Sequence, residues 1–169
     1  MYQTVYEIGA VPPRVGEWVG FLLAGVLIIA IGRQVRKRRF GLPFQRVIPF
    51  VVGTGFVIGG ATSLVVGWYK HHRAYRAYSR GDVAVYEGQV KLLREQPVGG
   101  HAPGDLVDVA GRELEVNYFM ANEPGYRLTV AHGGVLQDGA RVRVAVYEGR
   151  ILEVDLRESS AAPATSNLP

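Results

Sequence analysis

Two histidines in the second half of the chain have the surroundings in which side-chain chemistry is most often found. His101 lies in "VGGHAPGD" and His132 lies in "AHGGVLQDG", each beside a Gly-Gly pair. Together with Asp105 or Asp138, an imidazole can form a metal site or act as a general base. Glycines beside a histidine are also typical of ordinary turns. His101, Asp105 and His132 are therefore candidate residues of a ligand-binding loop.

The main catalytic classes find no support in the sequence. The chain has no cysteine, which excludes thiol catalysis, disulfide bonds and cysteine-based zinc sites. It also has no G-x-S-x-G, H-E-x-x-H, phosphate-loop or calcium-loop spacing. We therefore expect a protein that is not an enzyme and that uses no cofactor and no metal ion.

The glycine-rich stretch "GTGFVIGGATSLVVGW" at 53–68 is better explained by a membrane than by a nucleotide. Gly53, Gly55 and Gly59 give G-x-G-x-x-x-G, which differs from the dinucleotide pattern G-x-G-x-x-G, and the stretch has no charged residue. It lies inside a run of 23 uncharged residues at 47–69. About 20 apolar residues cross a hydrocarbon layer of about 30 Å, so 47–69 is predicted to be a transmembrane helix.

A second apolar segment, 15–32, contains "WVGFLLAGVLIIAIG" and precedes the first by a short loop. The segment before it, 1–14, lacks the positive charge of a secretory signal, and "RQVRKRR" follows where a cleavage site would stand. We therefore predict a retained transmembrane helix at 15–32. With the basic loop 33–46 and the helix 47–69, it forms a helical hairpin.

Small residues recur every fourth position on both predicted helices, as in the small-xxx-small contacts of membrane proteins. We expect them to pack the hairpin. A contact between copies, or the general abundance of glycine in membrane helices, remains an alternative explanation. The candidate helix-packing residues are Gly16, Gly20, Ala24, Gly55, Gly59, Ser63 and Gly67.

Basic and aromatic residues flank the apolar runs. Trp18, Trp68 and Tyr69 are expected at the membrane interface. A basic helix at 70–81, ended by Gly81, is expected to continue the second span, and His71–His72 to be part of its headgroup collar. The residues predicted to meet lipid headgroups are Arg33, Arg36, Lys37, Arg38, Arg39, Lys70, Arg73, Arg76 and Arg80.

Charge near the helix ends also bears on orientation. One basic residue precedes the first span and six follow it, which favours a cytoplasmic loop and a C-terminal domain outside the cytoplasm. The four basic residues after the second span favour the reverse. We expect a multi-pass protein of the bacterial inner membrane with its C-terminal domain outside.

Residues 82–157 change to alternating apolar and polar residues with turn glycines, which is typical of β-structure. Val142, Val144 and Val146 share one face, and Leu152 resumes it after a two-residue turn at Glu148-Gly149. Ala110-Gly111 repeats this arrangement, and a further strand is expected in "GYRLTVAH". We predict a small five- or six-stranded antiparallel, OB-like barrel, followed by a disordered tail at 158–169.

The two halves of the chain carry opposite charge. Of the net charge of +4, residues 1–81 contribute +9 and residues 82–169 contribute −5. The folded domain is therefore acidic, and a nucleic-acid partner is not expected.

Val85–Val90 and the "GG.L.DG..V.V" segment at Gly133–Val144 resemble a pattern of small bacterial membrane proteins without an established activity. Membrane helices before a β-domain closed by "DGARVRVAVYEGRILEV" are also similar to NfeD-like proteins. That resemblance implies an OB-type barrel and a role beside stomatin-like membrane scaffolds. We expect a membrane-anchored protein-interaction or assembly module that binds a protein partner or its own copies. The alternative is a ligand-binding or sensing domain.

Overall fold

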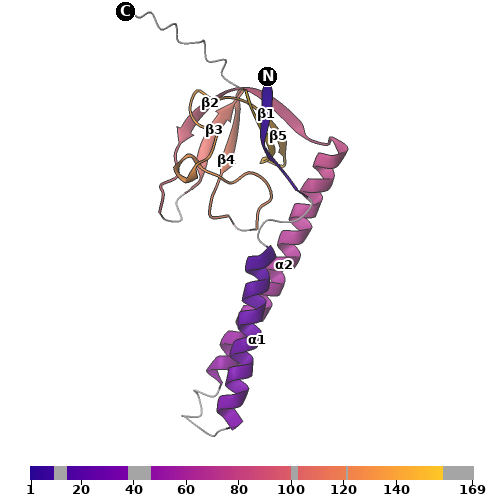
Figure 1. Cartoon of the computed structure of the whole chain (residues 1–169), viewed down its shortest axis with the longest axis vertical. Helices are drawn as coiled ribbons and strands as arrows, with labels where there is room; N and C mark the ends of the chain where they lie inside the picture. Colours follow the sequence, from indigo (N-terminus) through magenta and orange to yellow (C-terminus); the bar gives the residue numbers. More distant parts are fainter. Residues whose placement is uncertain (10–14, 38–46, 100–102, 121, 158–169) are drawn as a thin grey trace, which may run out of the picture. The chain divides into compact units, whose positions relative to one another are not determined.

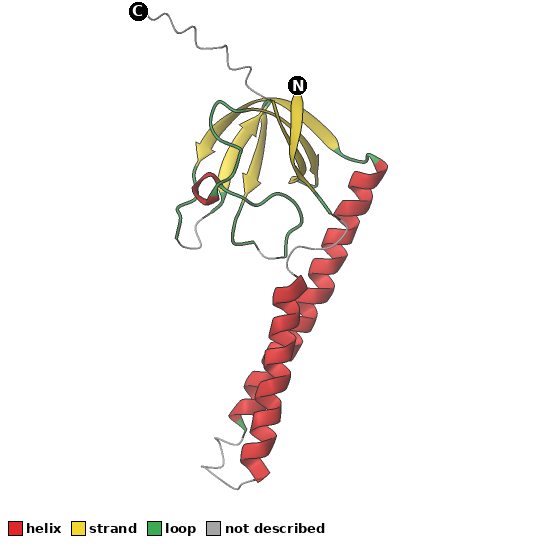
Figure 2. Cartoon of the chain, viewed as in Figure 1, coloured by secondary structure: helices red, strands yellow, loops and turns green. Residues whose placement is uncertain are grey.

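The structure is a computed structural model that describes residues 1–9, 15–37, 47–99, 103–120 and 122–157. It divides into two compact units. The β unit contains Met1–Ile8, Ala74–Met120 and the chain from Gly125 onward, and the helical unit contains Gly9–Arg73 and Ala121–Pro124. Figure 1 labels the elements, and Figure 2 separates helices from strands. The predicted tail at 158–169 lies outside the described residues.

The helical unit is built on helix α1 (Val15–Lys37) and on helix α2 (Ile48–Arg80) as far as Arg73. Both are long and apolar enough to cross a membrane, and most of each apolar segment is not buried by the protein itself. Helix α2 has Pro49 in its first turn, where a missing N–H costs little. It ends where Gly81 takes a φ of 77°, and the N–H of Asp82 donates to the carbonyl of Ala77. The second span and the predicted basic helix are thus one continuous helix.

Glycines bring α1 and α2 into close contact. A Cβ atom placed on Gly25 would lie 2.8 Å from the carbonyl oxygen of Gly53. A Cβ atom on Gly60 would lie 3.1 Å from the backbone nitrogen of Leu22. Trp18 lies against Gly67, so the two helices run antiparallel. Trp18, Gly25 and Gly32 are seven residues apart, as are Gly53, Gly60 and Gly67, and this period is typical of a left-handed helix pair.

The β unit holds one six-stranded sheet in the order β1-β6-β5-β2-β3-β4, in which every pair of neighbours is antiparallel. Strand β2 is long enough to pair with β5 through its first half and with β3 through its second half. The strands are β1 (Tyr2–Glu7), β2 (Ala84–Arg94), β3 (Asp105–Val109), β4 (Arg112–Val116), β5 (Arg141–Tyr147) and β6 (Arg150–Arg157).

The two predicted hairpin turns are confirmed. Ala110 and Gly111 join β3 to β4 with φ values of 53° and 80°. Glu148 and Gly149 join β5 to β6 with φ values of 47° and 77°. Two consecutive positive φ values are the mark of a type I′ turn, whose twist matches that of the flanking strands.

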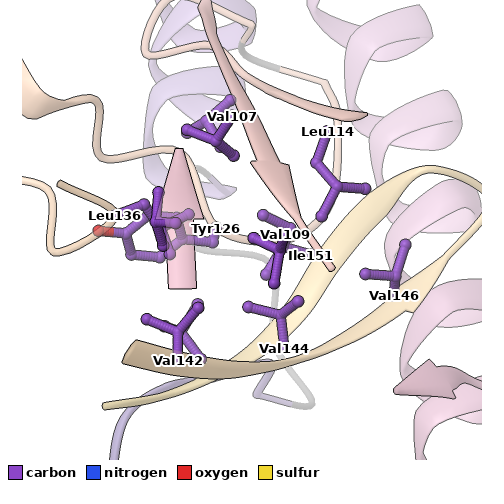
Figure 3. Close-up of a cluster of buried hydrophobic side chains, with 12 residues drawn as sticks. Val107, Val109, Leu114, Tyr126, Leu136, Val142, Val144, Val146 and Ile151 are labelled. Atoms are coloured by element: carbon purple, nitrogen blue, oxygen red, sulfur yellow. The ribbon is translucent and has the colours of Figure 1, made fainter. Parts of the chain in front are cut away.

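The main core of the β unit lies on the predicted valine face. Val142 and Val144 are fully buried, and Val146 joins them in the cluster shown in Figure 3. Strand β6 departs from simple alternation, because its pairing with β5 skips Leu152. Ile151 therefore enters the main core, and Leu152 packs instead in a second cluster with Ile8 and Ala74 of α2.

One predicted strand is absent from the described residues, and one observed strand lies where the sequence predicts none. Residues 126–130 form no strand, because Tyr126 makes a single backbone bond to Ile151 and the chain then enters a 3-10 turn, η2, at Val130–His132. The sixth strand is β1, which lies in the segment 1–14, where the sequence predicts no strand. Its pairing with β6 joins the first and the last strand of the described residues.

Candidate functional site

Two candidate ligand residues, Asp105 and His132, lie in or beside a network of buried polar groups. Gln96, which follows β2, is fully buried and donates its backbone N–H to Asp105 Oδ1 at 2.6 Å. Its side chain donates to Asn117 Oδ1 at 3.2 Å and accepts the backbone N–H of Tyr118 at 3.1 Å. Unpaired polar groups are costly when buried, so this paired glutamine fixes the start of the loop after β4.

Asp105 is held in the same network. Its side chain is buried, and its second oxygen, Oδ2, accepts the backbone N–H of Val130 at 2.7 Å. Both carboxylate oxygens thus bind main-chain donors from two different segments. This geometry supports a structural role for Asp105, in which the carboxylate connects the end of β2 to the turn η2.

His132 lies at the edge of the network, in an aromatic cluster. Its ring stacks on Tyr118 with centroids 3.8 Å apart and 7° between the planes, and Phe119 meets it edge to face at 5.7 Å. The Nδ1 atom of His132 is 2.7 Å from the hydroxyl oxygen of the buried Thr129. The three rings are each half-buried and offer a rigid, partly exposed aromatic surface.

The structure brings Asp105 and His132 to the same turn. The backbone N–H of Val130 donates to Asp105, and the hydroxyl of Thr129 hydrogen-bonds to His132. His101 lies outside the described residues. Within the described ranges, no group of three His, Cys, Asp or Glu residues is placed to hold a metal ion.

The predicted helix-packing residues fall on two different faces. Gly67 contacts Trp18, with an added Cβ only 2.6 Å from the indole Cζ2. By contrast, a Cβ added at four of the predicted glycines would meet nothing within 4 Å, which leaves the other helix beyond their reach. These four are Gly16, Gly20, Gly55 and Gly59. Ala24 and Ser63 are half-buried. A packing role for these four glycines remains a prediction. Within the chain, α1 and α2 contact each other at other glycines, among them Gly25, Gly53 and Gly60.

The predicted headgroup residues lie at the ends of the two helices. Arg33 and Arg36 are exposed on α1, as are Arg73, Arg76 and Arg80 on α2, and Lys37 is in the last turn of α1. Lys70 forms an ion pair with Glu123 at 2.6 Å. Arg38 and Arg39 lie outside the described residues. The expectation for His71 was wrong, because its side chain is buried and its Nε2 donates to the carbonyl of Gly9.

A carboxyl cluster that the sequence did not suggest lies where α2 ends against the sheet. Tyr78 hydrogen-bonds to the side chains of both Glu7 and Glu153, which are paired on β1 and β6. Burial, followed by the charge of Asp155, raises the pKa of Glu153 above its usual range. The three residues are far apart in sequence, and only the pairing of β1 with β6 brings them together.

Comparison of the chain with protein-family models, with curated proteins and with solved structures gave no match.

Proposed function

We propose that this protein is a membrane-anchored interaction or assembly module without catalytic activity. The observation that carries the proposal is the pairing of β1 with β6. Strand β1 precedes α1 and β6 follows α2, so a hairpin that crosses a bilayer twice must have both of its ends on the side of the sheet. Both ends of the anchor then continue into neighbouring strands of one sheet, which suits a module that holds a β-domain at a membrane.

The open glycines supply a surface through which such a module would assemble. Gly55 and Gly59 are one helical turn apart on α2 and have open space around them. In a bilayer, small residues allow two helix backbones to approach closely. We propose that this surface contacts a second copy or another membrane protein. Within the described residues, the buried side chains of Gln96 and Asp105 hydrogen-bond to backbone N–H groups, which favours binding over catalysis.

The finer assignments belong to the same proposal. We infer a closed OB-like barrel, a bacterial inner membrane and a β unit outside the cytoplasm, the last from the basic residues between the two helices. A β unit inside the cytoplasm would favour an NfeD-like role beside membrane scaffolds instead. No nucleic-acid partner is expected for the acidic β unit.

Purification in a mild detergent, followed by mass measurement, tests the proposal. We expect a defined oligomer, or a stable complex with another membrane protein, and we expect Gly59→Leu to reduce it. A strictly monomeric protein that retains no partner would remove the basis for an assembly role.

A second candidate function is the binding of a small ring-containing ligand, favoured by the aromatic cluster of Tyr118, Phe119 and His132. Stacking on such a surface is tolerant of many planar ligands. Thermal stabilisation of the full chain by nucleotides or glycans, and its loss in Tyr118→Ala, would support this function over assembly.

A further inference from the structure

The loop that follows β4 exposes apolar side chains beside basic ones. Met120 is 39% exposed and Leu128 is 45% exposed. A guanidinium nitrogen of Arg127 lies 3.4 Å from the carbonyl oxygen of Met120, and one of Arg150 lies 3.9 Å from its sulfur atom. Exposed apolar side chains among cationic groups are typical of protein surfaces that bind the headgroup region of a membrane.

The middle of this loop belongs to the helical unit. Ala121–Pro124 groups with the helices, and Glu123 pairs with Lys70. Lys70 is the first charged residue after the apolar run of α2 and follows Trp68 and Tyr69, which are residues typical of the membrane interface. If α2 crosses a bilayer, Glu123 is therefore at the level of the headgroups.

Chain length limits how far Met120 can be from that level. Glu123 is three positions after Met120 in the chain, and three extended residues span about 10 Å. Each polar layer of a bilayer is roughly 5–8 Å deep beyond the hydrocarbon. Met120 is therefore within reach of the headgroups.

The loop is also anchored at its start, so its apolar residues are held in place. Tyr118 donates its backbone N–H to the buried Gln96, and Phe119 donates its own to Asn117. The stacking of Tyr118 on His132 fixes the ring that precedes Met120. An apolar side chain presented from an anchored backbone loses little conformational entropy when it binds.

We propose that the exposed side chains of Met120 and Leu128 contact the surface of the bilayer that α1 and α2 cross, with Met120 at the boundary between headgroups and acyl chains. The positive groups of Arg127 and Arg150 favour anionic phospholipids there. This inference rests on the proposed membrane insertion and adds to it a lipid contact made by a loop outside the two helices.

The full chain has no cysteine, so single cysteine variants carry one label each. We would attach an environment-sensitive fluorophore to Met120→Cys and reconstitute the protein in vesicles of phosphatidylcholine and phosphatidylglycerol. Quenching by a lipid with a nitroxide near the headgroup reports contact with the bilayer, and quenching by iodide reports contact with water. Val65→Cys in α2 and Arg112→Cys at the exposed start of β4 serve as controls.

We expect the Met120 label to lose most of its fluorescence to the nitroxide lipid, and the Arg112 label to respond to iodide alone. A Met120 label that responds to iodide alone, or to neither quencher because it packs against protein, would overturn the inference. The Val65 label separates the two proposals. If it is not quenched by nitroxide lipid, the membrane insertion itself is wrong, whereas a quenched Val65 with an unquenched Met120 removes only the lipid contact of the loop.

Discussion

Glu7 on β1 lies directly opposite Glu153 on β6, although the two side chains bear the same charge. Like charges in directly opposed positions destabilise a strand pair. The structure offsets this through Tyr78, which hydrogen-bonds to both carboxyl groups. The contact between the first strand and the last is thus sensitive to the protonation of one cluster.

The stability of the protein should therefore depend on pH through Glu153. Its pKa is raised in the folded protein, mainly by burial, so protonation favours folding. This contribution is fully present below the ordinary carboxyl pKa and is lost as the pH rises through the raised pKa. Glu153→Gln should raise the thermal unfolding temperature at neutral pH and flatten its pH dependence. Glu95→Gln, at an exposed site, is the matched control, and an equal response of both variants would contradict the assignment.

Asp105 is predicted to support the loop rather than to perform chemistry. Asp105→Asn replaces one acceptor oxygen by an amide donor that faces a backbone N–H, so we expect a loss of about 1–3 kcal/mol in the free energy of unfolding. Asp108→Asn provides the comparison, because the hydrogen bond that Asp108 accepts comes from the exposed turn N–H of Gly111. Denaturant unfolding measures both variants. A loss no larger at Asp105 than at Asp108 would argue against the network.

Neighbouring glycines of α2 should differ in their tolerance of a side chain. Gly60→Leu would force a side chain into the backbone of Leu22, with an expected overpacking cost of about 1–3 kcal/mol. Gly59→Leu has open space within the chain, so it should leave the hairpin intact and weaken only an association between molecules. Thermal unfolding and oligomer mass in detergent separate the two effects. If Gly59→Leu destabilises the hairpin, the assignment of Gly60, and not Gly59, to the face of α2 that contacts α1 is wrong.

The type I′ turns offer a gain of stability. Ala110 takes a φ of 53°, which an alanine adopts at a cost of roughly 1–2 kcal/mol. Asparagine tolerates this conformation, so Ala110→Asn should stabilise the protein by up to about 1 kcal/mol. Gly111→Val, at a φ of 80°, should have the opposite effect. Thermal unfolding of the two variants gives the signs, and a stabilising Gly111→Val would contradict the turn assignment.

The sequence predicts the features of this fold that depend on neighbouring residues. The uncharged run of α2, the alternating valines of β5 and the Glu148-Gly149 turn each depend on local periodicity or turn chemistry. The face of α2 that contacts α1 is harder to predict from the sequence. Glycines at four-residue and at seven-residue spacing occur together on α2, and the sequence of one helix does not show which set contacts the other helix. Gly59 belongs to the first set and Gly60 to the second.

Pairings between strands that are far apart in the sequence cannot be predicted from local patterns. Strand β1 is six residues long and has no flanking hairpin, so its place beside β6 follows only from the fold. The candidate site also depends on long-range contacts. The sequence indicates His132 and Asp105 as candidates, whereas Gln96, which hydrogen-bonds to Asp105, Asn117 and Tyr118, has no motif around it. Buried polar residues of this kind are identified by their partners.

The central claim is that α1 and α2 cross a bilayer as a hairpin and leave both ends of the chain on one side. Labelling with a thiol reagent that does not cross membranes tests it directly, with single cysteines at Gln3, Arg36 and Glu148 in sealed vesicles. We predict that Gln3→Cys and Glu148→Cys react from the same side and that Arg36→Cys reacts only from the other. Labelling of all three positions from one side, with the vesicles intact, would contradict the account.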